Sequence, residues 1–428
     1  MIIRKFTIIG GGSAYVPGLM MALIRKSRRL HLDEIRLYDT DTRRLGIVTR
    51  LCSRLADANK AGFSVKAAED INEAVNGTDA VLNNARPGGF ECRKIDEALP
   101  LEFSIPGQET VGPGGFFFAL RSVPQALDLA RAVKEHAPGA VFLNYTNPTN
   151  IVTQALRDQG FSKVIGLCDQ SEEDLATLGS ALGIDHDHVR FDCSGLNHAT
   201  WYTGVRFNGH TPGEIPEDLA PPGDIDDEHK IRFALSRELA GKYPGYWPNS
   251  YIPYYIVPKY FTNFFRKNGT RTDAILDHLD DYYEHFKKES EKDIPDLQIY
   301  RGSSGFGDLA VRVLSSLSDA SPSRLVVNMP NLACTSIFDP ETVIECIADI
   351  STEGINQHPA PYPPGDFNDF MEQLESYQRM TAEAAVNGDA GAAAAALALN
   401  PLVADRDTAK AMLQRAQQEY GGRIPMFS

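Results

Sequence analysis

A short apolar run followed by a glycine-rich turn stands close to the start of the chain, in Phe6-Thr7-Ile8-Ile9-Gly10-Gly11-Gly12-Ser13. Its first four residues are aromatic, β-branched or apolar, which predicts a buried strand. The segment 16–30 then shows apolar residues at helical spacing. A glycine-rich turn between a strand and a helix N-terminus can hold the pyrophosphate of a dinucleotide. We therefore expect a dinucleotide to bind at Gly10, Gly11, Gly12 and Ser13.

The glycine turn supplies only the first two glycines of the G-x-G-x-x-G pattern, because Tyr15 stands at the third position. The context supports the interpretation, since a second strand is expected over Glu34–Tyr38 and ends at Asp39. A carboxylate there would accept hydrogen bonds from the ribose hydroxyls of the adenosine and would repel a 2′-phosphate. The sequence thus favours NAD over NADP.

Strand and helix patterns continue to alternate through the first half. Helices are expected over 42–61 and 123–136, and strands over 64–67, 79–83, 140–143 and 164–167. This order predicts the α/β class, with a Rossmann-type doubly wound parallel sheet whose ligand lies beyond the strand ends.

The second half is less regular, with helices expected over 273–291 and 381–398 and a strand over 324–328. The alanine-rich part from Gly388 is expected to form a close helix-packing surface. We expect a mixed α+β C-terminal substrate domain. The proposed division is 1–194 for the NAD-binding Rossmann-like domain and 195–428 for the substrate and catalytic domain, with no separable linker.

Composition excludes several classes of protein. The chain has 428 residues, 43% of them hydrophobic, and a formal net charge of −15, which opposes nucleic-acid binding. No apolar run approaches the roughly 20 residues that span a bilayer, and no signal-peptide pattern is present. We expect a cytoplasmic protein without a membrane partner. Six cysteines are too few for a disulfide framework in a chain of this length, so each is interpreted as a free thiol.

Two apolar runs end in polar groups that suit a metal. Ile165-Gly166-Leu167 leads into Cys168 and Asp169, and Ser194-Gly195-Leu196 leads into Asn197 and His198. Buried strands deliver side chains in this way to a site at their carboxyl ends. A soft thiolate and an imidazole can hold a divalent metal. Few enzyme classes need both a metal and a dinucleotide. Cys193 lacks a comparable motif and is expected to pack in the core.

Seven motifs occur together in one order, and through them the chain resembles glycoside hydrolase family 4, the NAD- and metal-dependent glycosidases. The resemblance covers at least residues 1–310. The motifs are Gly10-Gly11-Gly12-Ser13-Ala14-Tyr15, Asn84-Ala85-Arg86-Pro87-Gly88-Gly89, Gly107-Gln108-Glu109-Thr110, Asn147-Pro148, Gly166-Leu167-Cys168-Asp169, Gly195-Leu196-Asn197-His198 and Ser250-Tyr251-Ile252-Pro253-Tyr254-Tyr255.

The resemblance implies a redox-assisted elimination in place of the usual two-carboxylate scheme. NAD would oxidise C3 of the sugar, a base would remove the acidified C2 proton, and the aglycone would leave before water adds and the hydride returns. Cys168 and His198 match the family's ligands for a divalent cation, implied to be Mn²⁺. Tyr251 matches the proton acceptor at C2, and a nearby metal or cation would have to lower its pKa. Asp169 matches the proton donor of the α-glycoside branch.

The resemblance also implies a sugar with an anionic group at C6. Arg93, Asn147 and Arg271 match positions that contact a 6-phosphate, two guanidinium groups would suit such an anion, and Asn197 is expected to contact the sugar. A 6-sulfonated sugar, sulfoquinovose, remains an alternative substrate. Gln170-Ser171 and Thr149-Asn150 depart from the family pattern beside the sugar site, so the anomer stays open. A homodimer or homotetramer is also implied.

Two other classes of function remain open at this point. A simple NAD-dependent dehydrogenase would share the glycine turn and Asp39, but would use a histidine partnered by a carboxylate and would turn over NAD stoichiometrically. A non-catalytic NAD sensor would not need Cys168, His198 and Tyr251 together.

Overall fold

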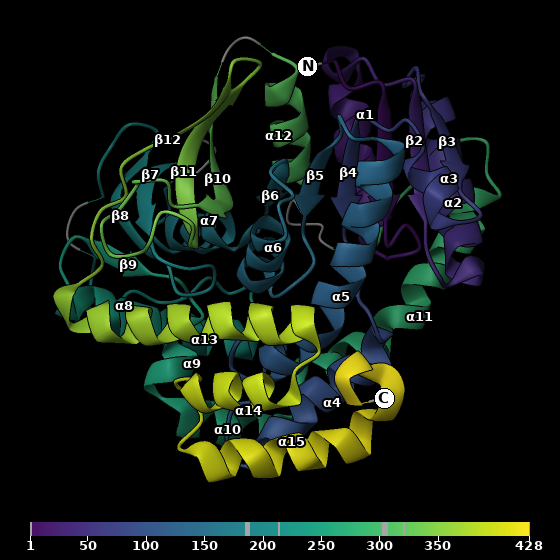
Figure 1. Cartoon of the computed structure of the whole chain (residues 1–428). Helices are drawn as coiled ribbons and strands as arrows, with labels where there is room; N and C mark the ends of the chain where they lie inside the picture. Colours follow the sequence, from purple (N-terminus) through teal and green to yellow (C-terminus); the bar gives the residue numbers. More distant parts are fainter. Residues whose placement is uncertain (1, 185–188, 213–214, 302–306, 320–321, 428) are drawn as a thin grey trace.

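The computed structural model describes residues 2–184, 189–212, 215–301, 307–319 and 322–427. A nine-stranded mixed sheet runs through the molecule in the order β12-β11-β10-β6-β5-β4-β1-β2-β3 (Figure 1). Its first six strands in the sequence are all parallel and follow the Rossmann order 3-2-1-4-5-6. They are β1 (Lys5–Ile9), β2 (Glu34–Tyr38), β3 (Ser64–Ala67), β4 (Ala80–Asn83), β5 (Val141–Asn144) and β6 (Val164–Gly166).

The helices that accompany these strands follow the expected alternation. The central strands β1, β4, β5 and β6 are almost fully buried, as in a parallel sheet covered on both faces, whereas β2 and β3 toward the edge bury only some of their residues. The doubly wound Rossmann-type fold predicted from the sequence is confirmed. The helices of this half are α1 (Val16–Leu30), α2 (Thr42–Ala58), α3 (Ile71–Val75), α4 (Gly89–Glu102), α5 (Gly112–His136), α6 (Thr149–Asp158) and α7 (Gln170–Ala181).

The second half extends the same sheet. Strand β10 (Ser323–Pro330) pairs antiparallel with β6 through Asn328 and Gly166, and β11 (Val343–Ser351) and β12 (Gly354–Gln357) follow it. A separate three-stranded antiparallel sheet contains β7 (Val189–Ser194), β8 (Trp201–Phe207) and β9 (Tyr246–Pro248). The C-terminal half is therefore mixed α+β, as expected, and shares its largest sheet with the N-terminal half.

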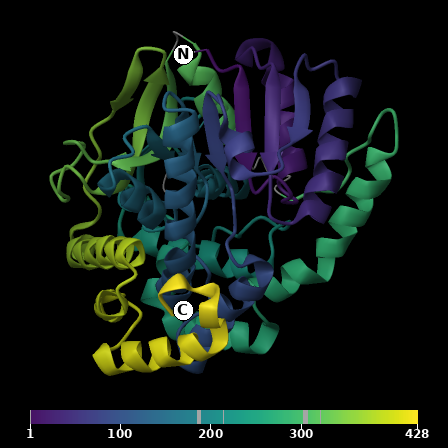
Figure 2. The ribbon, with the colours of Figure 1, turned by 45° about the vertical axis from the view of Figure 1, so that its right-hand side comes forward.

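The remaining helices lie mostly beyond one end of the large sheet. Figures 1 and 2 both show α13, α14 and α15 stacked there, with α11 reaching toward α2 on the other side. These helices are α8 (Asp227–Lys242), α9 (Ile252–Ile256), α10 (Pro258–Asn268), α11 (Arg271–Ser290), α12 (Asp308–Leu317), α13 (Asn368–Asn387), α14 (Ala390–Leu399) and α15 (Arg406–Tyr420).

Two expected helices differ from the structure. The segment 381–398 is two helices, because Gly388 ends α13 in the left-handed region at φ 66° and the Asp389 side chain caps α14. The alanines of α14 pack closely against α13, as expected of small side chains. Helix α5 begins at Gly112 rather than at Val123, since its first turns are buried on all sides and lack an amphipathic pattern.

Candidate active site

The two residues of the expected metal site meet in the structure. Cys168 lies two residues after the last residue of β6, at the carboxyl end of the parallel strands, and His198 lies in the loop between β7 and β8 at φ 66°. Cys168 Sγ is 3.5 Å from His198 Nε2. Metal–sulfur and metal–nitrogen bonds are about 2.0–2.3 Å long, so both atoms can ligate one ion.

The protonation states of this pair follow from burial. Burial, assisted by the positive charge of Arg232, lowers the pKa of His198 to about 3, so its imidazole is neutral at physiological pH and keeps a free lone pair. Burial, together with the Glu345 carboxylate, raises the pKa of the Cys168 thiol. In the part of the chain that the structure describes, no group of three or more His, Cys, Asp or Glu side chains could hold a metal. An ion here would need further ligands from substrate or water.

Tyr251 completes this cluster. Its ring stacks on the ring of His198, with centroids 4.2 Å apart and planes inclined by 9°. The guanidinium carbon of Arg232 lies 4.9 Å from the centroid of the Tyr251 ring. Burial raises the pKa of Tyr251, while Arg232 and Arg271 act in the opposite direction. The cations required beside a basic tyrosine are therefore present. Their effect on the pKa of Tyr251 is smaller than that of burial, so a bound metal would have to supply the rest of the lowering.

Asp169 stands at the N-terminus of α7, next to Cys168. Its Oδ1 accepts a 2.8 Å hydrogen bond from the hydroxyl of Tyr145. Burial raises the pKa of Asp169 to about 8, and the nearby Glu173 and Glu172 add to this effect, whereas the bond from Tyr145 opposes it. A carboxyl with this pKa is largely protonated at neutral pH and can donate its proton.

A buried carboxylate fixes the segment that carries His198. Glu345, on β11, is fully buried and accepts hydrogen bonds from Asn197 Nδ2 (2.9 Å), Ser171 Oγ (3.0 Å) and Thr200 Oγ1. Asn197 was expected from the sequence to contact the sugar. Its side-chain amide donates one hydrogen bond to Glu345. The structure therefore gives Asn197 a role in shaping the loop as well as a place beside the site.

The glycine turn has the close contacts that a phosphate-binding loop requires. A Cβ atom on Gly10 would lie 2.5 Å from the carbonyl oxygen of Asn84, and Gly10 has φ +80°. Asp39 accepts hydrogen bonds of 2.9 Å from the backbone amides of Gly12 and Asp41. Its carboxylate therefore lies against the glycine turn, where the sequence placed it.

Four arginines gather between the glycine turn and Tyr251. Arg93 is 3% exposed and is held by Glu97 Oε1 and Glu109 Oε1, each at 2.9 Å, and Arg86 also pairs with Glu109.

The charges of this region shift one another's pKa values. Burial acts to lower the pKa of Arg271, but Tyr251, Glu228 and Tyr15 raise it above its usual value. Arg301 bonds the Tyr15 hydroxyl at 2.9 Å. Burial would raise the pKa of Glu109, but Arg86 and Arg93 lower it to about 2.

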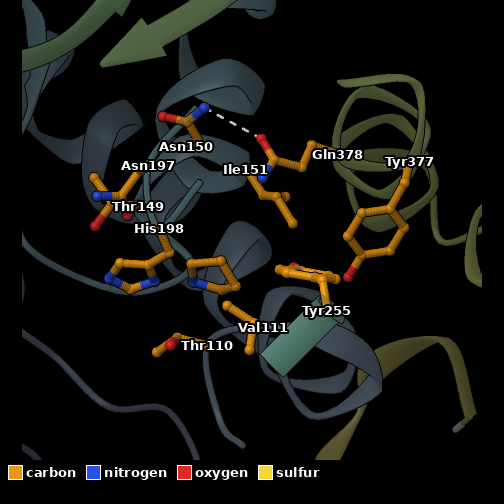
Figure 3. Close-up of a pocket in the computed structure, with 11 residues that line it drawn as sticks. Thr110, Val111, Thr149, Asn150, Ile151, Asn197, His198, Tyr255, Tyr377 and Gln378 are labelled. Atoms are coloured by element: carbon orange, nitrogen blue, oxygen red, sulfur yellow. Dashed lines mark hydrogen bonds between the residues drawn. The ribbon is translucent and has the colours of Figure 1, made fainter. Parts of the chain in front are cut away.

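A pocket opens beside His198 at the point where α13 passes the start of α6 (Figure 3). Asn197 and His198 form one side, and Tyr255 and Tyr377 form another. Asn150 donates a 3.1 Å hydrogen bond to Gln378, which joins the start of α6 to α13. Asn147 precedes this turn, and its Oδ1 accepts a 3.2 Å hydrogen bond from the Thr149 hydroxyl.

Sequence reasoning missed several residues of the site. Glu345 is a lone charge inside the apolar run Val343–Ala348, a pattern that indicates a buried functional carboxylate. Arg86 and Glu109 stood inside quoted motifs without an assigned role. Arg301 begins a segment of sequence that loosely matches a glycine motif of the family, but no role was assigned to it. Arg232 carried no signal in the sequence, because its place depends on how distant segments pack.

The comparisons with known proteins agree with this geometry. The family model described as family 4 glycosyl hydrolase matches residues 5–179, and that of its C-terminal domain matches residues 193–403. The chain belongs to glycosyl hydrolase family 4. It is 30% identical to a probable 6-phospho-beta-glucosidase of Bacillus subtilis, over 99% of this chain and 98% of that protein. A 6-phospho-alpha-glucosidase of Lacticaseibacillus paracasei is 29% identical over 80% of each chain.

Solved structures place this family 4 hydrolase in the same fold. A 6-phospho-alpha-glucosidase from gut microorganisms, in complex with NAD and Mn²⁺, superposes with a TM-score of 0.91 at 21% identity, over 98% of this chain and 99% of that one. The Thermotoga maritima 6-phospho-beta glucosidase, with NAD and glucose-6-phosphate, gives 0.83 at 25% identity, over 97% and 98%. Across the described residues, no helix is long and apolar enough to cross a membrane.

Proposed function

We propose that this enzyme is an NAD- and divalent-metal-dependent glycosidase that cleaves a glucoside with an anionic C6 group, a 6-phospho-glucoside in the first instance. The observation that carries the proposal is the convergence of the half-buried Cys168 with the buried His198 and Tyr251 in one cluster beyond the sheet. Related proteins named as 6-phospho-glucosidases of both anomeric types support the choice of substrate.

The residues present fit both cofactors. The glycine turn approaches Asn84 so closely that only glycine fits at position 10, and Asp39 presents a carboxylate beside it. Gly10, Gly11, Gly12, Ser13 and Asp39 would hold NAD. The thiol of Cys168 and the neutral imidazole of His198 would hold Mn²⁺. When bound, NAD supplies reversible hydride transfer at C3 of the sugar and the metal supplies Lewis-acid stabilisation of charge on the sugar oxygens.

The protein's own groups would perform the proton transfers. Once C3 is a ketone, the C2 proton is acidic, and Tyr251 accepts it from its position between His198 and Arg232. Asp169, which the hydrogen bond from the Tyr145 hydroxyl holds in place, donates a proton to the departing oxygen. Water then adds at C1 of the unsaturated sugar and Tyr251 returns a proton to C2, after which the hydride chemistry that a bound NAD would supply restores the hydroxyl at C3. Net consumption of the cofactor is zero, which separates this activity from that of a dehydrogenase.

The C6 anion would be bound by arginines. Arg93 and Arg271 were expected from the sequence, and Arg301 adds a third cation beside Tyr15. Asn147 lies at the start of α6, and Asn197 lies beside His198 in the pocket of Figure 3. Carboxylates already engage two nitrogens of Arg93, so Arg271 and Arg301 are the arginines better able to contact the anion.

A panel of aryl glycosides, α and β, with phosphate, sulfonate, carboxylate or hydroxyl at C6 tests the proposal when it is assayed with NAD and Mn²⁺. Cleavage of the phosphate compounds, dependent on both cofactors and without accumulation of NADH, is the expected result. Preference for the sulfonate compounds would indicate a sulfoquinovosidase that uses the same chemistry. Stoichiometric NADH with no released aryl alcohol would indicate a dehydrogenase.

The functional division, location and assembly also belong to the proposal. Residues 1–194 would hold NAD, and 195–428 would supply most of the sugar side, although both halves share one sheet. A cytoplasmic location fits six free cysteines, including a thiol at the metal site that an oxidising compartment would threaten. A homodimer or homotetramer is proposed from family resemblance, and light scattering tests it.

A further inference from the structure

A buried carboxylate outside the metal cluster links two arginines of the expected anion site. Glu97 lies on α4, one helical turn after Arg93, and is 1% exposed. Its Oε1 accepts a hydrogen bond from Arg93 Nε at 2.9 Å, and its Oε2 accepts one from the backbone amide of Thr272 at 2.8 Å. Thr272 follows Arg271 directly in the chain. One carboxylate therefore holds the side chain of the first arginine and the backbone beside the second.

The bond to Thr272 fixes the N-terminus of α11, where Arg271 is the first residue. The first amides of a helix have no partner within the helix, and a carboxylate is a favourable acceptor there. Thr270 and Asp273 bond each other in a capping box around Arg271, and Lys94 of α4 pairs with Asp273 at 3.2 Å. Contacts with α4 thus determine where α11 begins, and with it where the backbone of Arg271 lies.

The opposite side of the Arg93 guanidinium is also held. Glu109 Oε1 pairs with Arg93 Nη1 at 2.9 Å, and Arg86 pairs with the same carboxylate. Arg93 is therefore fixed between two carboxylates, and Glu97 ties this fixed group to α11. Such rigidity favours binding, because a ligand loses affinity when the groups that contact it must first be ordered.

The guanidinium of Arg271 is available for a ligand. Arg271 is only partly buried, and of the residues that the structure describes none forms a hydrogen bond or an ion pair with its side chain. Burial acts to lower the pKa of Arg93, but Glu109 and Glu97 raise it, and the nearby positive charge of Arg271 opposes them. Arg271 thus lies within the field of Arg93. An anion that Arg271 contacts would supply the counter-charge that two neighbouring cations need.

We propose that Glu97 is a positioning residue for recognition of the C6 anion, which places Arg271 beside Arg93 and is itself too buried to touch the sugar. The inference rests on the proposed function, because it takes Arg271 as a contact of the anion. A guanidinium donates in a rigid planar fork, so a shift of the backbone that carries it weakens its match to the anion. The C6 group is remote from C1, C2 and C3, so the loss falls mainly on KM.

Glu97→Gln distinguishes three roles of this carboxylate. The amide keeps one acceptor oxygen but turns a donor toward the other N–H group, so one of the two bonds is lost. If Glu97 positions Arg271, KM for the aryl glucoside with phosphate at C6 should rise about ten-fold, with kcat within about three-fold. If Glu97 acts only through its charge, its removal makes the anion site more positive, and KM should fall. If it only stabilises the fold, the free energy of unfolding falls and KM stays the same.

Glu97→Asp is the second variant. It keeps the charge but is shorter by one methylene, so it cannot hold both donors, and KM should rise about ten-fold as in E97Q. A role through charge alone would leave KM of E97D near that of the unchanged enzyme. Thermal unfolding establishes that each variant is folded. If the panel selects the sulfonate, the same comparison is made with the aryl glucoside that carries sulfonate at C6.

Asp96→Asn is the matched control on the same helix. Asp96 is fully buried like Glu97, but it bonds Arg121 of α5 and Tyr420 of α15 rather than α11. D96N should therefore lower the free energy of unfolding, measured in urea, and leave KM unchanged. Glu102→Gln is a milder control, since it removes a partly exposed ion pair between α4 and Arg415.

Binding of glucose 6-phosphate to the enzyme loaded with NAD and Mn²⁺, measured by calorimetry, gives a second readout. Its Kd should rise about ten-fold in E97Q and E97D, while the Kd of NAD stays the same. An unchanged or lower KM and Kd in folded E97Q and E97D would overturn the proposal, as would an equal rise in D96N. An unchanged enzyme that binds no glucose 6-phosphate and cleaves no aryl glucoside with a C6 anion refutes the proposed function itself, and the role of Glu97 falls with it.

Discussion

The imidazole of His198 lies parallel to the phenol ring of Tyr251, with ring centroids 4.2 Å apart. His198 comes from the loop between β7 and β8, whereas Tyr251 opens α9, so the stack joins two segments that approach the sheet separately. Both rings are buried, at 5% and 8% exposure. A proposed metal ligand and a proposed base are thereby held in one fixed relationship, and a substitution that keeps the ring of one residue keeps the packing of the other.

Tyr251→Phe separates proton transfer from packing. The remaining ring keeps the stack on His198, while the hydroxyl that accepts the C2 proton is lost. Turnover is expected to fall about 100-fold or more, in the range of general base catalysis, with NAD and Mn²⁺ affinities retained.

In the unchanged enzyme, product formed in D₂O should carry deuterium at C2. A working enzyme whose product keeps its original C2 hydrogen would exclude the elimination route. Tyr260→Phe, at an exposed tyrosine, is the matched control and should retain activity.

Cys168→Ser tests the metal site. A bound cysteine ligates as a negatively charged thiolate, whereas a serine hydroxyl stays protonated and neutral, so Mn²⁺ affinity should fall at least ten-fold. NAD affinity should change little, because the glycine turn lies elsewhere. Metal content by mass spectrometry and NAD titration by calorimetry give the two measurements.

The control for this variant is Cys193→Ser. It makes the same atomic change in a buried cysteine of another apolar cluster and should leave metal affinity intact. Full activity of the unchanged enzyme with its metal verified at zero would refute the metal requirement.

Asp39→Ala tests the position of the dinucleotide. Asp39 would accept hydrogen bonds from the ribose, and bonds to a charged group contribute about 1.5–3 kcal/mol, so NAD should bind roughly 10–100-fold more weakly. The ratio of NAD to NADP affinity should fall, since the repulsive carboxylate is gone. Asp41→Ala, which removes the cap of α2 two residues away, should leave that ratio unchanged. Equal NAD affinity in D39A and the unchanged enzyme would show that the ribose lies elsewhere.

The Rossmann half could be predicted from the sequence because its signals are local. Short apolar strands, a glycine turn and Asp39 at the end of the second strand all lie within 40 residues of one another. The break at Gly388 was equally local: a glycine in the left-handed region followed by a capping Asp389 is a readable helix boundary, and the alanine-rich pattern concealed it.

The addition of β10, β11 and β12 to the same sheet could not be predicted in this way. The pairing of Asn328 with Gly166 joins positions far apart in the sequence, and nothing in either segment names its partner. The site shows the same contrast. Cys168, His198 and Tyr251 lie in recognisable motifs, whereas Arg232 reaches Tyr251 only through the packing of α8. Local patterns identified the chemical groups, and long-range packing supplied those that position them.

Glu345→Ala tests the carboxylate that fixes the His198 loop. The substitution leaves Asn197 Nδ2 and Ser171 Oγ without their buried acceptor, while Thr200 Oγ1 can still donate to the carbonyl oxygen of Leu196 at 3.1 Å. Each unpaired donor costs roughly 1–3 kcal/mol, and the lost volume leaves a cavity. The free energy of unfolding should therefore fall by about 3 kcal/mol or more, as measured by urea denaturation.

Two further variants distinguish positioning from bulk stability. Glu345→Gln keeps the volume and one acceptor oxygen, so its loss of stability should be smaller, while Mn²⁺ affinity still falls because Asn197 and the adjoining His198 lose their fixed orientation. Direct hydrogen-bond partners of metal ligands typically change affinity about 10–100-fold, and Glu345 acts one step further out through Asn197, so we expect a fall of about ten-fold. Glu353→Ala, at an exposed site in the turn after β11, should change neither quantity. If E345Q unfolded like E345A yet bound Mn²⁺ as tightly as the unchanged enzyme, Glu345 would be a purely structural residue, and the loop would owe its geometry to the backbone alone.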